Sequence, residues 1–111
     1  MRNALSPIKS HIKIAFVYGS IARGEEKQRS DIDLLIIGEV SFSDVVINLQ
    51  ASQKILGREV NPTVYSSVEF RSKLRENYHF VTSVINGPKI YLIGDDNELR
   101  RLAEKRMARR A

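Results

Sequence analysis

The stretch "YGSIARGEEKQRSDIDLLIIG" (residues 18–38) decides the fold, because it places a small, flexible Gly-Ser corner and two carboxylates around one loop. The residues before the loop, "IKIAFVYG" (12–19), are largely β-branched and aromatic and predict a strand. The residues after it, "DIDLLIIG" (31–38), predict a second strand, whose apolar end indicates burial on both faces. The intervening "SIARG" predicts a short helical turn capped by Ser20 and closed by Gly24.

The rest of the sequence continues this alternation of strands and helices. The expected elements are helix 41–56, strand 58–66, helix 67–87 with a break near Asn77, strand 88–94 and helix 96–110. Ser43 is the expected cap of the first helix and Gly57 its stop, and Asp96 or Asn97 is expected to cap the last helix. Pro62 cannot donate to a ladder, so either its strand lies at an edge of the sheet or Pro62 lies at the end of the strand. This order predicts an α/β (α+β) domain, a small mixed central β-sheet with helices packed on it.

Asp31 and Asp33 are one residue apart, so in a strand they project to the same face, about 7 Å from each other. Two like charges at this spacing repel each other unless a cation lies between them. Mg²⁺ takes oxygen ligands, often one or two carboxylates together with substrate phosphates. The alternative is structural: Asp31 caps a turn, and Asp33 pairs with Arg23 or Arg29.

Gly19 and Ser20 lie where the first strand meets the turn. Backbone N–H groups at the start of a helical turn and the helix dipole both favour an anion. Gly19 permits close approach of the backbone, and Ser20 adds a hydroxyl donor. Any strand-to-helix turn also favours Gly-Ser, but a phosphate cradle joined to a carboxylate pair predicts a site for a metal-bound nucleoside triphosphate. Tyr18 beside it either stacks on a base or packs in the core.

This order of Gly-Ser, ten residues, Asp-x-Asp and apolar residues resembles the signature of the DNA polymerase β-like nucleotidyltransferases, in the minimal-nucleotidyltransferase branch. Ala22, Arg23 and Gly24 after the Ser, and Ser30 before Asp31, also match the signature. The resemblance implies the polymerase β-like nucleotidyltransferase fold over residues 1–111.

The resemblance also implies an activity and its ligands. A nucleoside monophosphate, AMP from ATP or the equivalent from another nucleoside triphosphate, would be transferred to a macromolecular acceptor such as a protein. Two Mg²⁺ (or Mn²⁺) ions would be held by Asp31 and Asp33. The implied nucleotide-binding residues are Gly19, Ser20, Arg23 and Ser30. The alternative for Arg23 is an ion pair with Glu26 on the surface. Members of this branch are often paired with a small helical HEPN protein, the toxin half of a toxin–antitoxin system, so the resemblance implies a partner of that kind.

One position departs from the family pattern. A third carboxylate is expected on the strand "GREVNPTVY", and Asn61 stands in its place. Asn61 can offer a carbonyl oxygen to a metal but cannot act as a general base. Glu59 shares the face of Asn61 by two-residue alternation and reaches further, which makes it the candidate catalytic carboxylate. Either Glu59 supplies the third carboxylate, or the site binds nucleotide with little or no transfer.

The composition sets limits on the class of protein. Of the 111 residues, 42% are hydrophobic and 28% are charged, as in an ordinary globular chain. The absence of cysteine excludes disulfides and thiolate metal sites. No apolar run approaches the roughly 20 residues that span a bilayer. The N-terminal residues lack the apolar centre of a signal peptide, so a cytoplasmic location away from membranes is expected.

The net charge of +5 is concentrated at the C-terminus. Residues 98–111 hold six basic and two acidic residues, whereas residues 1–97 are nearly neutral. Apolar residues at helical spacing predict a helix with one buried face, formed by Leu99, Leu102, Ala103 and Met107. The expected exposed face is basic and holds Arg100, Arg101, Lys105 and Arg109. Such a face is either ordinary solvated surface or a site for nucleic acid or an acidic partner.

Three functions are therefore compatible with the sequence. The first is a nucleotidyltransferase whose acceptor binds as a separate partner, because the chain is too small to carry an acceptor-binding domain. The second is a catalytically degenerate module that binds nucleotide or docks a partner, possibly as half of a toxin–antitoxin pair, with Asn61 as the sign of lost catalysis. The third, with the weakest support, is nucleic-acid binding through the basic C-terminal helix.

Overall fold

A four-stranded sheet forms the centre of the molecule in a computed structural model that describes residues 2–24 and 31–108. The strands are β1 (Ile12–Tyr18), β2 (Ile32–Gly38), β3 (Val60–Tyr65) and β4 (Ile90–Ile93), in the order β3-β2-β1-β4. β1 is antiparallel to β2 and β4, while β2 and β3 are parallel. The predicted mixed sheet is therefore confirmed, and so is the edge position of the strand that contains Pro62.

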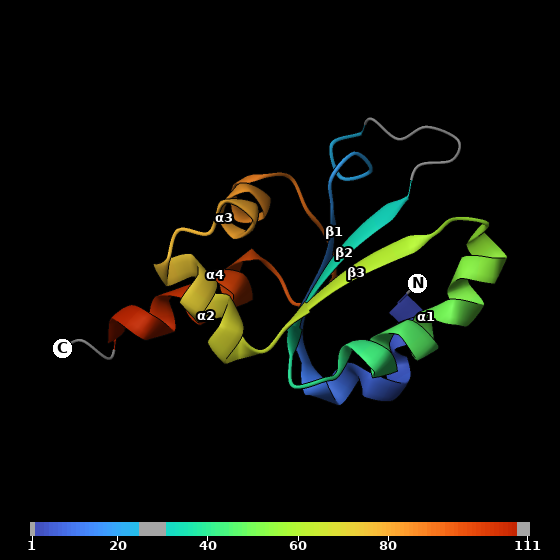
Figure 1. Ribbon diagram of the computed structural model, residues 1–111, viewed down its shortest axis with the longest axis horizontal. Helices are drawn as coiled ribbons and strands as arrows, with labels where there is room; N and C mark the ends of the chain where they lie inside the picture. Colours follow the sequence, from blue (N-terminus) through green and yellow to red (C-terminus); the bar gives the residue numbers. More distant parts are fainter. Residues whose placement is uncertain (1, 25–30, 109–111) are drawn as a thin grey trace.

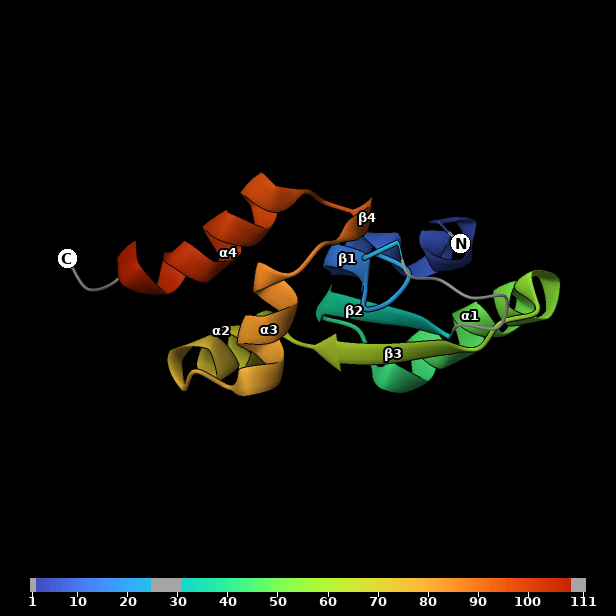
Figure 2. The same cartoon turned by 90° about the horizontal axis from the view of Figure 1, so that it is seen from above.

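Helices cover both faces of this sheet (Figure 1). One face carries the 3₁₀-helix η1 (Arg2–His11) and helix α1 (Phe42–Leu56). The other carries α2 (Ser67–Arg75), α3 (His79–Asn86) and α4 (Asp96–Ala108). Figure 2 shows the same layers from above, with β1 and β2 between η1 and α1 on one side and α3 on the other.

The apolar run of β2 is explained by these two layers. Leu34 and Ile36 are buried in the core shared with η1 and α1. Leu35 and Ile37 alternate with them and are buried in the core shared with α2, α3 and α4. A strand covered on both faces needs apolar side chains at successive positions, which is what the sequence predicts for this segment.

The ends of the helices follow local hydrogen bonds, and two expected caps are wrong by one or two residues. Ser41, not Ser43, caps α1: its extended backbone lets the side chain accept the N–H of Asp44 at 3.1 Å. Asp95, not Asp96 or Asn97, caps α4 by accepting the N–H of Glu98 at 2.8 Å. The predicted break between α2 and α3 is confirmed at Asn77, which adopts a positive φ of 54°.

Two further segments complete the first half of the fold. The short helical turn predicted after β1 is present as one hydrogen-bonded turn, in which the N–H of Arg23 donates to the carbonyl of Gly19 at 3.0 Å. Gly24 ends the turn with a φ of 76°, as predicted. The sequence analysis did not identify η1, whose Leu5 is fully buried and whose Ile8 packs one 3₁₀ turn later against the same core.

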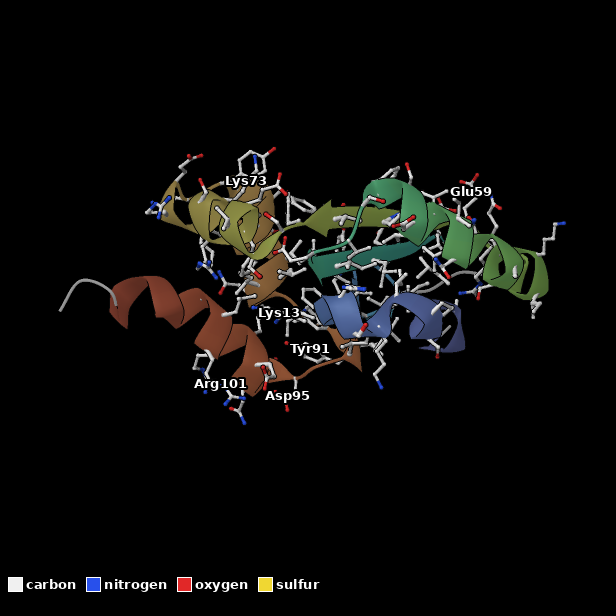
Figure 3. The ribbon with its side chains drawn as sticks, turned by 90° about the horizontal axis from the view of Figure 1, so that it is seen from below. Lys13, Glu59, Lys73, Tyr91, Asp95 and Arg101 are labelled. Carbon is white, nitrogen blue, oxygen red and sulfur yellow. The ribbon has the colours of Figure 1, made fainter. Side chains whose placement is uncertain are left out.

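Helix α4 follows β4, which is an edge strand of the sheet. Leu99 and Leu102 are buried in one core with α2 and α3, whereas Arg100 and Arg101 are exposed, which confirms the predicted division of its faces at these four positions. The side chains of Lys105, Met107 and Arg109 lie outside the described residues. Figure 3 shows Arg101 here, near Asp95 and Tyr91 and far from Glu59; Arg101 also pairs with Glu98 on the exposed face. In the parts of the chain that the structure describes, no helix is both long and apolar enough to cross a membrane.

Candidate nucleotide and metal site

Three polar side chains form a row across the sheet. In the antiparallel pair of β1 and β2, Tyr18 lies opposite Asp33. In the parallel pair of β2 and β3, Asp33 lies beside Asn61. Residues paired across a sheet project to the same face, so all three belong to the face that α2, α3 and α4 cover. Asn61 therefore lies beside Asp33 on this face of the sheet.

Asp31 joins this row from the residue before β2. Its Oδ2 atom accepts a hydrogen bond from the Nδ2 atom of Asn61, at a distance of 3.3 Å. The hydrogen bonds between β2 and β3 begin at the next residue, where the N–H of Ile32 donates to the carbonyl of Glu59 at 2.9 Å. Asp31 is exposed and Asp33 is half-buried, so the pair runs from solvent towards the interior of the site.

The Gly-Ser corner lies directly against Asp33. A Cβ atom added to Gly19 would stand 2.6 Å from the Oδ2 atom of Asp33, closer than real Cβ contacts allow. Gly19 also has a φ of 79°, in the region that favours glycine. Only glycine therefore lets the backbone of the turn approach the carboxylate this closely. The two halves of the motif, ten residues apart in sequence, form one site.

Tyr18 connects this site to the helical layer. Its ring packs edge-on against Phe80 of α3, with the centroids 5.7 Å apart, and against Phe16, at 6.5 Å. Burial raises the pKa of the Tyr18 phenol, a hydrogen bond with Thr63 opposes the increase, and the negative charge of Asp33 adds to it. The phenol therefore stays neutral at physiological pH.

An open cavity of about 440 Å³ lies over the Gly-Ser corner. The motif contributes Tyr18, Gly19, Ser20, Arg23 and Asp33 to its walls. The opposite wall consists of Phe80, Ser83 and Val84 of α3, with Gly87 and Pro88 of the segment that leads to β4. That segment passes beside β1 in Figure 1. Sequence reasoning missed this second wall, because nothing in residues 80–88 resembles a motif.

The other residues predicted for the site have separate positions. Arg23 lies on the cavity wall. Ser30 lies outside the described residues. Asp31 and Asn61 flank the cavity without lining it, at the end of β2 and on β3. The structure therefore brings together Gly19, Ser20, Arg23 and Asp33, and places Asp31 with Asn61 beside them.

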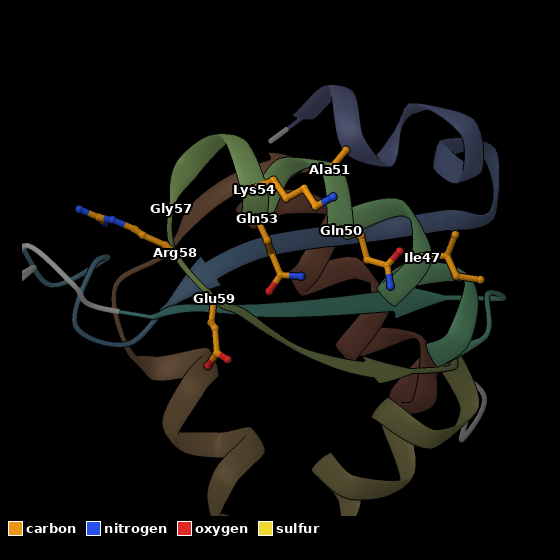
Figure 4. Close-up of a pocket in the computed structure, with 8 residues that line it drawn as sticks. All are labelled: Ile47, Gln50, Ala51, Gln53, Lys54, Gly57, Arg58 and Glu59. Atoms are coloured by element: carbon orange, nitrogen blue, oxygen red, sulfur yellow. The ribbon is translucent and has the colours of Figure 1, made fainter.

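Glu59 is exposed, and its carboxylate points away from α1 (Figure 4). Glu59 comes directly before β3, and its place on the face of Asn61 and Asp33 stays a prediction from two-residue alternation. Glu59 borders a larger hollow of about 890 Å³, which lies along α1 and includes Gln50 and Lys54. Within residues 2–24 and 31–108, no three carboxylate or histidine side chains gather closely enough to hold a metal ion. Glu59 thus does not complete such a group with Asp31 and Asp33.

Comparison with known proteins assigns this geometry to a family. The sequence model of the family "Polymerase beta, Nucleotidyltransferase" matches residues 4–92, which include β1, β2, β3, most of β4 and the whole Gly-Ser to Asp-x-Asp motif. The chain belongs to this nucleotidyltransferase family. The resemblance found in the motif is thereby confirmed.

Two relatives from Methanocaldococcus jannaschii are similar in sequence. "Putative protein adenylyltransferase MJ0604" is 41% identical over 81 residues, which are 69% of this chain and 78% of the relative. "Putative protein adenylyltransferase MJ0435" is 40% identical over 63 residues, which are 55% of this chain and 68% of the relative. Both identities are high enough to place the proteins in one family.

Solved structures support the fold at lower identity. A chain in the crystal structure of a mutant of the toxin–antitoxin pair MntA–HpeT matches with a TM-score of 0.64 at 14% identity, over 97% of this chain and 82% of that chain. A chain in the complex of tri-AMPylated Shewanella oneidensis HEPN toxin with MNT antitoxin matches with a TM-score of 0.53 at 15% identity, over 99% and 87%. The polymerase β-like nucleotidyltransferase fold is confirmed.

The donor atoms of this nucleotidyltransferase site suit a hard divalent cation. Asp31 and Asp33 offer carboxylate oxygens on one face, and the amide of Asn61 is held at 3.3 Å from Asp31. Magnesium is bound in proteins by one or two carboxylates that are completed by substrate phosphates and water. The pair of carboxylates beside the Gly-Ser corner therefore fits a divalent cation in its donor chemistry.

Proposed function

We propose that this chain is a metal-dependent nucleotidyltransferase that moves AMP from ATP to a macromolecular acceptor. Membership of the family and the adenylyltransferase names of its relatives support the reaction class. The observation that carries the proposal is the contact between Gly19 and the Asp33 carboxylate. This contact supports a site in which the Gly-Ser corner would receive phosphates and Asp33 would hold a metal ion, both within reach of one triphosphate.

The reaction is an in-line displacement at the α-phosphorus of ATP. An acceptor hydroxyl oxygen forms a bond to the α-phosphorus, and the bond from that phosphorus to the bridging oxygen of the β-phosphate breaks. AMP remains on the acceptor, and pyrophosphate leaves with the electron pair of the broken bond. The hydroxyl proton passes to a general base, for which Glu59 is the candidate.

Asp31, Asp33 and the amide oxygen of Asn61 would hold Mg²⁺ or Mn²⁺. When bound, the ions supply positive charge that stabilises both the attacking and the leaving oxygen. The chain itself orients the substrate: Gly19 and Ser20 receive the terminal phosphates, Arg23 on the cavity wall contacts them with its planar fork, and Ser30 completes the nucleotide site.

We further propose a protein as acceptor, in the form of a small helical HEPN-type partner. The support is the fold match to toxin–antitoxin complexes, one of which contains an AMPylated HEPN toxin and another AMP-PNP. The chain would act in the cytoplasm, where such an acceptor and ATP meet. The basic exposed face of α4 is assigned to solvent or docking, with nucleic acid as the weaker alternative.

The reaction can be tested with ATP that carries the label on different phosphates. Purified protein, Mg²⁺ and a co-expressed HEPN-type protein are incubated with α-labelled or γ-labelled ATP and separated on a denaturing gel. Nucleotidyl transfer labels the acceptor from α-labelled ATP and leaves it unlabelled from γ-labelled ATP. Label from the γ-position would indicate phosphoryl transfer instead, and no label from either would support the binding module.

Removal of divalent cations is expected to weaken ATP binding by at least about tenfold, because two carboxylates then face the triphosphate without a counter-charge. Calorimetric titration of ATP in Mg²⁺ and in excess EDTA measures the difference. A matched titration with adenosine, which carries no phosphate, should show no dependence on the cation. Equal affinities for ATP in both solutions would contradict the metal role.

Glu59→Gln is expected to lower transfer by about 100-fold or more while ATP affinity stays nearly unchanged, because a base acts on the acceptor and not on the nucleotide. Asn61→Asp is expected to raise transfer or leave it unchanged, since it adds a carboxylate beside Asp31 and Asp33. Glu76→Gln, an exposed carboxylate at the end of α2, serves as the control.

A catalytically degenerate module is the second candidate, and a specific observation favours it. The described residues contain no group of three metal-binding carboxylates or histidines, and Asn61 occupies the position of the third carboxylate. In that case Glu59→Gln has no effect, and wild-type protein binds ATP without transfer. Transfer that appears only in Asn61→Asp would establish this second function.

A further inference from the structure

The cavity over the Gly-Ser corner has two chemically different halves. One half is polar and consists of Gly19, Ser20, Arg23 and Asp33. The other half is largely apolar, with Phe80 and Val84 of α3 and Pro88 of the following segment. A nucleoside triphosphate has the same division, a highly charged chain at one end and a flat, weakly polar base at the other.

The apolar half belongs to a rigid part of the molecule. Val84 is only 6% exposed and lies in the core between the sheet and the helices. Phe80 is half-buried and packs edge-on against Tyr18, so the wall is tied to the strand that leads into the Gly-Ser corner. A wall that is fixed before binding loses little conformational entropy when a ligand contacts it.

Part of this wall is formed by backbone and by a small side chain. Gly87 lines the cavity with backbone only, in a position where an added Cβ would lie 3.3 Å from the carbonyl oxygen of Ser83. Ser83 is exposed on α3 and is the hydroxyl group that the helical wall presents to the cavity. The volume of about 440 Å³ is within the range of pockets that hold small ligands.

We propose that α3 and the segment that connects it to β4 form the nucleoside subsite of this nucleotidyltransferase. The base packs against Phe80 and Pro88, and the Ser83 hydroxyl bonds to the nucleoside. The triphosphate then extends across Tyr18 to Gly19, Ser20 and Asp33. This assignment rests on the proposed function, since it presumes that the polar half of the cavity receives the phosphates.

The subsite is tested by comparing ATP with inorganic tripolyphosphate, which carries the charged half of the ligand alone. With Mg²⁺ present, calorimetry of the full chain should give an affinity for ATP at least about tenfold higher than for tripolyphosphate, because contact with an aromatic wall adds to binding. Ser83→Phe fills the subsite from an exposed position. It should lower ATP affinity about tenfold or more and leave tripolyphosphate affinity unchanged.

Asn86→Phe is the matched control, because Asn86 is exposed on the same helix and does not line the cavity. It should change neither affinity. Phe80→Trp adds a single fluorophore to a chain without tryptophan, and ATP should change its emission while tripolyphosphate does not. A change in the emission of Phe80→Trp with ATP but not with tripolyphosphate would support the subsite even if Ser83→Phe failed to fold.

Two outcomes would overturn the proposal, and they are distinguishable. Equal affinities for ATP and tripolyphosphate, or equal losses of ATP binding in Ser83→Phe and Asn86→Phe, would place the nucleoside elsewhere while the phosphate site remains. If the wild-type protein bound neither ligand in Mg²⁺, the proposed function and the subsite would both fail.

Discussion

Asp33→Asn should lower nucleotidyl transfer by at least about 100-fold, since even the loss of groups that only support metal ligands costs 10–100-fold. Asp33 lies at the centre of the row formed with Tyr18 and Asn61, directly against Gly19. The amide keeps the size of the side chain but removes its negative charge. Relief of repulsion from Asp31 should leave the melting temperature unchanged or slightly higher.

The measurement combines label transfer from ATP with thermal unfolding of the same samples. Asp44→Asn is the control, because Asp44 is an exposed carboxylate on α1, on the other face of the sheet. Its transfer rate should equal that of the wild type. If Asp33→Asn unfolds the protein, or if both variants retain full transfer, Asp33 has a structural role and the proposed metal site is wrong.

Gly19→Ala should damage both stability and activity. The positive φ of 79° costs about 1–2 kcal/mol for a residue with a Cβ. The new methyl group would also lie 2.6 Å from Asp33 Oδ2, so the carboxylate or the turn must move. Displacement of a ligand group by about 1 Å can lower a rate about 100-fold, so we expect a loss of transfer of that order.

Gly24→Ala separates these two effects. Gly24 has nearly the same φ, 76°, but no atom lies within 4 Å of an added Cβ. Both variants should lose similar stability from backbone strain in denaturant unfolding, and only Gly19→Ala should lose most of its transfer activity and Mg²⁺-dependent ATP binding. A similar loss of activity in the two variants would show that strain in the turn, and not contact with Asp33, is responsible.

The sequence by itself determined the features that depend on short-range chemistry. β-branched runs predicted β1 and β2, Pro62 predicted the edge strand, and Gly57 and Asn77 predicted where helices end. These features depend on the φ preference of a residue or on the backbone N–H that proline lacks, and both are properties of single residues. The motif also identified the carboxylate pair and the Gly-Ser corner. The caps Ser41 and Asp95 were missed because neighbouring serines and acids compete for the same N–H groups.

The tertiary structure alone decided how the site is completed. Phe80, Ser83 and Pro88 form a wall of the cavity only because α3 packs against Tyr18, more than sixty residues earlier in the chain. Asn61 donates a hydrogen bond to Asp31 because the parallel register of β2 and β3 brings these two residues close together. Such contacts depend on which elements meet in space, and apolar side chains that serve as core or as a ligand wall look the same in sequence.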